Sequence, residues 1–181
     1  PGTMLLACVA RLTKQKGLFD LLKAMSRLRE AAPEARLLLV GRGELLPKLR
    51  EAVDLLGLRP FVRFTGFRRD IRRILSGSDL MVLPSHWEGF GLVLLEAMEA
   101  GIPVVGTRVG AIPEVVADGE TGIIVPPHDP DALATGLVRL LRNPETAVAM
   151  GEAGRRRLAE EFGMRKAVEA HENLYEELLR K

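Results

Sequence analysis

Short runs of aliphatic residues alternate along the chain with longer segments in which apolar residues recur every three or four positions. The short runs are apolar at nearly every position, which is typical of strands buried on both faces of a parallel sheet. The longer segments have the period of amphipathic helices. The pattern predicts strands at residues 4–10, 35–41, 61–66, 79–84, 102–107 and 121–127. It predicts helices between them at residues 18–32, 44–57, 69–77, 91–101 and 112–117.

Three more helices are expected after the last strand. Asp129-Pro130 and Asn143-Pro144 each combine a capping residue with a proline at the first helical position, so they start the first two. The third is expected at about residues 164–180. Pro47 suits the first turn of the helix at 44–57. Because no linker, repeat or low-complexity segment interrupts this order, one domain is expected over residues 1–181.

Alternation of apolar strands with helices predicts an α/β fold, a doubly wound parallel six-stranded sheet with helices on both faces. Ligands of such sheets bind outside the carboxyl ends of the strands. Function is therefore sought in the loops that follow the strands, at residues 10–17, 41–44, 65–68, 84–90, 107–111 and 126–129.

Composition narrows the class of partner. The 181 residues include 26 basic and 24 acidic side chains, a balance too even to indicate a nucleic-acid partner. Hydrophobic residues make up 47% and charged residues 28%, which is typical of a globular domain. No apolar run has transmembrane length and no signal-peptide pattern opens the chain, so a cytoplasmic location is expected.

Cysteine and histidine usage gives no sign of a metal centre. The single cysteine, Cys8, lies in an apolar run, and one cysteine cannot form a disulfide within the chain. His86, His128 and His171 are isolated from one another along the chain. We therefore expect no metal site, and we interpret His86 and Trp87 as wall residues of a binding pocket with no chemical role.

The loop after the first strand, ARLTKQKG at residues 10–17, is strongly basic. It lacks the G-x-G-x-x-G fingerprint of a dinucleotide site, and the chain has no P-loop motif. It offers Arg11, Lys14 and Lys16 at the end of a buried strand, where cations can neutralise a diphosphate or can be ordinary solvated charges. The residues of this loop alone leave both readings open.

The loop after the fourth strand is the more informative one. Gly89 and Gly91 flank Phe90 just before an apolar helix. Glycines let the backbone approach a ligand closely, and a helix N-terminus presents unpaired N–H groups with positive dipole character. This arrangement predicts an anion site with a phosphate as its occupant. Glu88 precedes it and can accept hydrogen bonds from sugar hydroxyls at the rim.

Glu96 lies in the following helix among residues that leave little polar surface. A helix that is apolar nearly all round is expected to be buried, and glutamate is seldom buried without partners. Glu96 is either a single solvent-facing residue or the acceptor for the two hydroxyls of a vicinal diol such as a ribose. Two arginine clusters, at residues 68–73 and 155–157, are interpreted as solvated faces because aromatic partners are scarce.

Taken together, these segments resemble glycosyltransferase family 4 (group 1), which are retaining enzymes with the GT-B fold. EGFGLVLLEAM resembles the family's E-x7-E signature, and ARLTKQKG resembles its G-R-L-x-x-x-K-G segment with Ala10 in place of the usual glycine. Further family-like segments follow in the right order: LLLVGRGE, VRFTGF, AGIPVVGTRVGAIPEVVADGETGIIVPPHDPDALA and YEELL. The resemblance covers essentially the whole chain.

The resemblance implies a Rossmann-like C-terminal half of a GT-B fold that binds a nucleoside diphosphate sugar and requires no metal. It places Arg11 and Lys16 on the donor diphosphate and Glu88 against the transferred sugar. Backbone amides at the sugar and phosphate would come from Gly89, Phe90 and Gly91, with Leu92 close by. Glu96 would hold the ribose hydroxyls, and the segment from Gly66 to Arg68 would seat the base.

The resemblance also implies a missing N-terminal domain that binds the acceptor, which is a glycan, a lipid or a small molecule. The isolated chain is then expected to transfer little or no sugar. Its final helix is expected to lack its packing partner, with an apolar patch exposed at the interdomain face. Peripheral attachment of the longer enzyme to a membrane stays open. One alternative is a non-catalytic nucleotide-sugar-binding or scaffolding domain. Another is a GT-B epimerase, although the E-x7-E spacing favours the transferase.

Overall fold

The computed structural model describes residues 2–180, without the side chains of residues 164, 165, 167, 169, 170, 173 and 174. Its centre is a six-stranded sheet in the order β3-β2-β1-β4-β5-β6, and every pairing is parallel. This confirms the predicted doubly wound sheet. The strands are β1 (Met4–Val9), β2 (Ala35–Val40), β3 (Val62–Gly66), β4 (Leu80–Leu83), β5 (Val104–Thr107) and β6 (Gly122–Val125).

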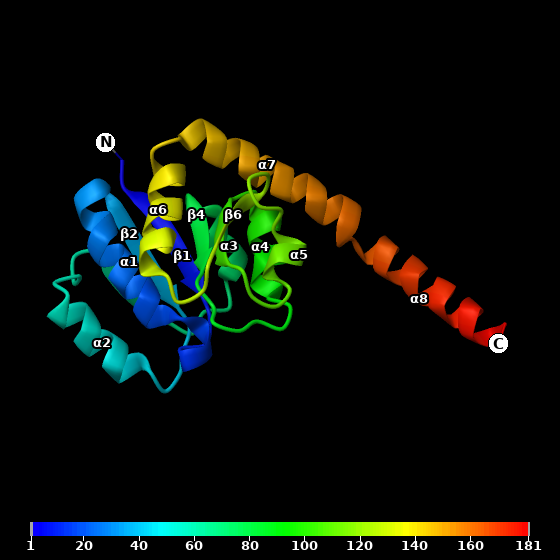
Figure 1. Cartoon of the computed structure of the whole chain (residues 1–181), viewed down its shortest axis with the longest axis horizontal. Coiled ribbons are helices and arrows are strands. Elements are labelled where there is room, and N and C mark those ends of the chain that lie inside the picture. Colours follow the sequence, from blue (N-terminus) through cyan, green and yellow to red (C-terminus); the bar gives the residue numbers. More distant parts are fainter. Residues whose placement is uncertain (1, 181) are drawn as a thin grey trace.

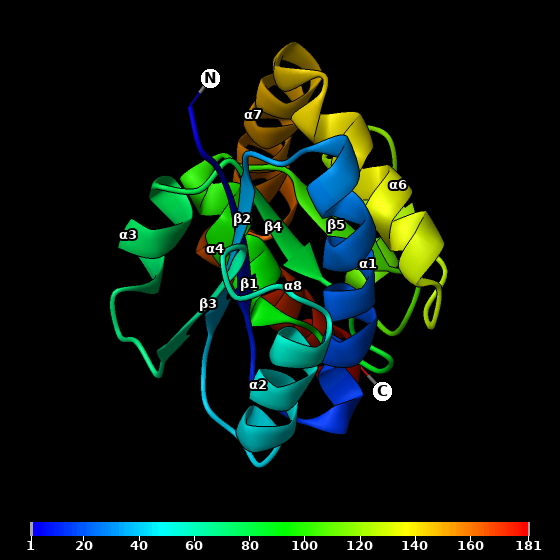
Figure 2. The ribbon, with the colours of Figure 1, turned by 90° about the vertical axis from the view of Figure 1, so that its left-hand side faces the viewer.

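Helices cover both faces of the sheet. Figure 2 shows α1 and α6 on one side and α3 and α4 on the other. Successive side chains of β1 point to opposite faces of the sheet, so Leu6 and Cys8 belong to one buried cluster and Ala7 belongs to the other. The helices are α1 (Leu18–Ala31), α2 (Leu46–Leu55), α3 (Ile71–Ser76), α4 (Leu92–Ala100), α5 (Ile112–Val115), α6 (Pro130–Leu141), α7 (Pro144–Glu161) and α8 (Met164–Leu179).

Most helix starts follow the expected local chemistry. Pro47 lies in the first turn of α2, and the Asp129 carboxylate caps α6 by accepting from the N–H groups of residues 131 and 132. Asn143 stands at the start of α7 but does not cap it with its side chain, contrary to the prediction. Its amide instead donates to the carbonyl of Arg139 at 2.7 Å, which closes the end of the preceding helix.

The expectation that α4 is buried all round is wrong. Its buried residues are Leu94, Ala97 and Met98, which share one face, whereas Leu92 is 72% exposed. Val93 and Leu95 are partly buried and pack against the same cluster, so Leu92 is the apolar side chain of α4 that stays at the surface. The hydrophobic pattern alone does not distinguish a helix packed on one side from one packed on both.

The two arginine clusters differ from one another. Arg68, Arg69, Arg72 and Arg73 are all exposed, as predicted. In the second cluster, Arg155 donates to the carbonyl of Ala100, and Arg157 donates to the carbonyls of residues 114 and 115. These bonds attach α7 to α4 and α5. Arg155 and Arg156 are nevertheless exposed, as predicted, and Arg157 is half-buried.

The last helix leaves the body of the domain. Figure 1 shows α8 extending away from the sheet beyond the end of α7. Val168, Tyr175, Leu178 and Leu179 are exposed on it, as expected of an apolar surface without a neighbour. No helix within residues 2–180 is both long and apolar enough to cross a membrane.

Candidate functional site

A buried ion pair joins the two loops at the point where the strand order reverses, between β1 and β4. The ammonium group of Lys16, after β1, pairs with the carboxylate of Glu88, after β4, and these side chains are only 12% and 9% exposed. The hydroxyl of Ser85 donates to the same carboxylate at 3.1 Å. The hydroxyl of Thr107 in turn donates to the Ser85 carbonyl at 2.5 Å. The structure thus brings two predicted site residues into direct contact.

Close packing of backbone against backbone fixes the loop that carries Glu88. A short 3-10 turn at Lys14–Lys16, which was not predicted, presents the Gln15 carbonyl to the His86 N–H at 2.8 Å. Gly17 and Gly110 both have positive φ, of 61° and 51°. A Cβ atom at Gly17 would overlap the Pro84 carbonyl, and one at Gly110 would overlap the Glu88 carbonyl. Glycine is therefore required on both sides of this loop.

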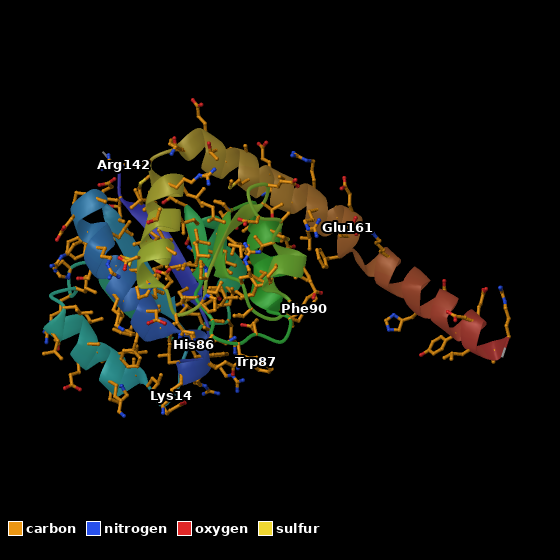
Figure 3. The ribbon with its side chains drawn as sticks, viewed as in Figure 1. Lys14, His86, Trp87, Phe90, Arg142 and Glu161 are labelled. Carbon is orange, nitrogen blue, oxygen red and sulfur yellow. The ribbon has the colours of Figure 1, made fainter. Side chains whose placement is uncertain are left out.

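The turn that follows Glu88 leaves backbone donors free. Gly91 has a φ of 77° and stands at the N-terminus of α4, where no side chain caps the helix. The N–H groups of Gly89, Phe90 and Gly91 donate to no acceptor within residues 2–180. Unpaired donors at a helix N-terminus are the features from which an anion site was predicted for this segment. Figure 3 shows Phe90 at the same end of the molecule as Lys14, His86 and Trp87.

A cavity of about 610 Å³ lies at the carboxyl ends of β1 and β2, lined in part by the loop after β1 but by no residue of the loop after β4. The side chain of Arg11 lines it, as does Arg68 from the predicted base-binding segment, whereas Gly66 is not part of its lining. The Thr13 hydroxyl at its wall is buried and has no hydrogen-bond partner in the described part of the chain. The full lining is Val9, Ala10, Arg11, Thr13, Val40, Gly41, Arg42, Gly43, Glu44, Phe67, Arg68 and Ile71.

Three arginines line the cavity, and they differ in their electrostatic setting. Arg11 is exposed and, within residues 2–180, forms no ion pair. The Arg68 guanidinium donates two hydrogen bonds, of 2.8 and 2.6 Å, to the Asp70 carboxylate. These bonds hold the pKa of the Asp70 carboxyl below its usual range. Arg42 lies over the Phe67 ring, 5.2 Å from its centroid. Within residues 2–180, Arg11 and Arg42 are therefore the cavity cations without a carboxylate partner.

Glu96 is neither fully buried nor paired. Partial burial raises the pKa of its carboxyl, and the nearby Glu99 adds to that shift, while Arg72 opposes it. Arg72 itself pairs with Glu99 at 2.6 Å. Within residues 2–180 the Glu96 carboxylate has no hydrogen-bond or ion-pair partner. It is therefore available to a ligand, although it lies outside the lining of the cavity.

The structure also brings together residues that the sequence reading kept apart. The rings of His86 and His128 lie 3.7 Å apart between centroids, so the expectation that the histidines are isolated is wrong for this pair. His86 Nε2 lies 2.7 Å from Asp20 Oδ2. The contact arises because the loops after β4 and β6 meet at one edge of the sheet, a proximity that linear spacing does not reveal.

Comparison with known proteins places the chain in a family. Residues 2–157 match the family model described as "Glycosyl transferases group 1". The chain is 37% identical over 172 residues to N-acetyl-alpha-D-glucosaminyl L-malate synthase of Bacillus anthracis, which is 95% of this chain and 45% of that protein. The chain thus spans about half the length of the curated relatives it matches.

Solved structures agree with this assignment. Sucrose-phosphate synthase from Thermosynechococcus elongatus superposes with a TM-score of 0.87 at 32% identity, over 98% of this chain and 46% of that one. HepE from Anabaena, solved in complex with UDP and glucose, gives a TM-score of 0.87 at 25% identity, over 99% and 49%. The six-stranded Rossmann-like sheet matches GT-B glycosyltransferase structures. The chain belongs to the group 1 glycosyl transferases.

Proposed function

We propose that this chain is the donor-binding half of a retaining glycosyltransferase of family 4, which transfers a sugar from a nucleoside diphosphate sugar to an acceptor. The observation that carries the proposal is the Lys16–Glu88 pair at the strand reversal, with free backbone donors on one side and the Arg11 cavity on the other. Support comes from HepE, which was solved with UDP and glucose. An acceptor-binding domain elsewhere in a longer protein completes the proposal.

The proposed donor lies across the carboxyl edge of the sheet. Its base enters the cavity beside Arg68 and the adjoining Gly66, and its ribose hydroxyls donate to Glu96. Its diphosphate accepts from Arg11 and from the free N–H groups of residues 89–91, with Leu92 alongside. Its sugar then lies against Glu88, where carboxylate oxygens accept from sugar hydroxyls. Each group of the donor meets the chemistry that suits it.

Electrostatic stabilisation of the leaving group is the proposed source of catalysis. Departure of the nucleoside diphosphate builds negative charge on the β-phosphate, and Arg11, Lys16 and the α4 N-terminus counter it. An ammonium group has three donors, so Lys16 keeps two for the phosphate while one serves Glu88. Glu88 thus orients the ammonium group of Lys16 and stabilises the positive charge that develops on the sugar. The chain's own cations supply the charge, so the step as proposed needs no metal.

Calorimetric titration with UDP-, GDP- and ADP-sugars tests the binding part of this proposal. One of the three is expected to bind, and Arg11→Ala and Glu96→Ala should each weaken that binding by about tenfold or more, because each removes a charged hydrogen-bond partner. Arg59→Ala and Glu99→Ala are matched controls. Arg59 pairs with Asp54, away from the carboxyl edge of the sheet. Glu99 lies on the same helix as Glu96 and pairs with Arg72. Unchanged affinity in both test variants contradicts the assignment.

A further inference from the structure

A compact cluster of metal-ligating side chains lies at the same edge of the sheet, outside the proposed donor site. Asp20 comes from the first turn of α1, His86 from the loop after β4 and His128 from the loop after β6. One ligand atom from each lies within 4.8 Å of the other two. A ring nitrogen of each histidine faces the same carboxylate oxygen. His86 Nε2 lies 2.7 Å and His128 Nδ1 lies 4.0 Å from Asp20 Oδ2.

The backbone conformation of His128 is a second observation that points to a ligand-binding role for this cluster. Its φ is 59°, and within residues 2–180 it is the one residue other than glycine with a positive φ. Glycine and asparagine fit that conformation best, so the turn by itself does not call for histidine. The conformation places the imidazole of His128 beside the ring of His86, 3.7 Å away between centroids.

We propose that Asp20, His86 and His128 bind one divalent cation of the zinc type. Two imidazole nitrogens and a carboxylate form a ligand set that zinc accepts in tetrahedral sites, whereas magnesium and calcium prefer oxygen ligands throughout. Zinc bonds of about 2.0–2.2 Å place neighbouring ligand atoms roughly 3.3 Å apart. The two distances to Asp20 Oδ2 lie on either side of that value, so small side-chain rotations reach it. His128 is 66% exposed on its side chain, which leaves the fourth position open to water.

One neighbouring cation competes for the carboxylate. Lys23 Nζ lies 3.8 Å from Asp20 Oδ1, which is the oxygen that the histidines do not address. Its side chain is 60% exposed and so can move into solvent when the ion binds. Oδ2 is left to the metal ion.

A bound ion would join three segments that are distant in sequence. Through His86, which is two residues before Glu88, it would link the loop after β4 to α1 and to the loop before α6. That loop is already held by the His86 N–H on the Gln15 carbonyl, so the ion would add a second fastening. The role assigned to the ion is to stiffen the support of Glu88. The proposal concerns metal binding alone and does not depend on the chain binding a nucleotide sugar.

Zinc titration followed by calorimetry and thermal unfolding tests the proposal. We expect one zinc ion per chain and a rise in Tm, since a ligand bound only to the folded state stabilises it. Asp20→Asn and His128→Asn should each weaken binding by about tenfold or more. The second variant should still fold, because asparagine tolerates a positive φ. Asp131→Asn, His171→Asn and titration with magnesium are the controls and should show no such change.

Proton NMR of the histidine rings gives an independent readout on the unmodified chain. Zinc should move the ring signals of His86 and His128 together and leave those of His171 in place. Absence of zinc binding, zinc affinity in both cluster variants equal to that of the unmodified chain, or a shift confined to His171 would overturn the proposal.

Discussion

At the scale of single residues, the buried pair of Lys16 and Glu88 dominates the electrostatics of the site. Replacing Lys16 by methionine would leave a carboxylate buried and unpaired apart from the Ser85 hydroxyl. We expect Lys16→Met to lower the free energy of unfolding by about 3 kcal/mol, measured by urea denaturation. Arg59→Met breaks an exposed pair with Asp54 and should change stability little. Equal effects in the two variants would show that the Lys16–Glu88 pair is not buried in solution.

The raised pKa of Glu96 predicts how the stability of the protein depends on pH. Because its folded-state pKa is raised above the ordinary value of 4.5, the folded protein favours the protonated carboxyl. Its contribution to stability is therefore fully present below pH 4.5 and is lost as pH rises through the folded pKa. Glu96→Gln should be slightly more stable than the wild type at pH 7, and the difference should vanish toward pH 4.5. Urea unfolding at both pH values measures it, and a difference that does not change with pH contradicts the expectation.

Sequence reasoning proposed the charged residues of the candidate site but not the contacts between them. Lys16 and Glu88 were assigned separately, one to a diphosphate and the other to a sugar, and the structure pairs them. Their contact depends on β1 lying next to β4, a consequence of topology that no local pattern contains. Asp20 and His128 were missed for the same reason, since they meet only through the order of the strands.

At the scale of elements, the loops of the functional edge are held by close backbone contacts. Gly110 and Gly119 both have positive φ, but only Gly110 faces a neighbouring backbone, that of Glu88. Gly119→Ala should cost about 1–2 kcal/mol from conformational strain alone. Gly110→Ala adds the steric overlap and should cost about 1–3 kcal/mol more. Urea denaturation of both variants separates the two effects, and equal losses would argue against tight packing of this loop on Glu88.

The elements themselves were largely predictable, because strands buried on both faces have an unmistakable apolar pattern. Every predicted strand is present, with ends that shift by at most two residues. The failures have local causes. Asn143 has a second hydrogen-bonding option in the Arg139 carbonyl, and Leu92 of α4 is exposed although it is apolar.

At the scale of the whole molecule, α8 stands apart from the body of the domain (Figure 1). A chain that ends after Gly163 should keep the free energy of unfolding of the full chain, because the exposed apolar residues of α8 contribute no burial here. A chain that ends after Asn143 also loses α7, whose Met150 is buried and whose Gly154 packs on Met98. That shorter chain should be strongly destabilised. A large loss of stability in the first truncation would mean that α8 packs on the domain in solution.

The chain spans about half the length of the curated relatives it matches, and the contribution proposed for it is donor recognition. That contribution is the central claim, and a map of backbone amide NMR shifts on addition of the best-binding nucleotide sugar tests it most directly. The account predicts shifts at residues 11–16, 41–43, 66–68 and 89–92, with Arg36 and residues 59–61 at the other end of the sheet unchanged. Shifts confined to that other end, or no shifts at saturating ligand, would contradict it.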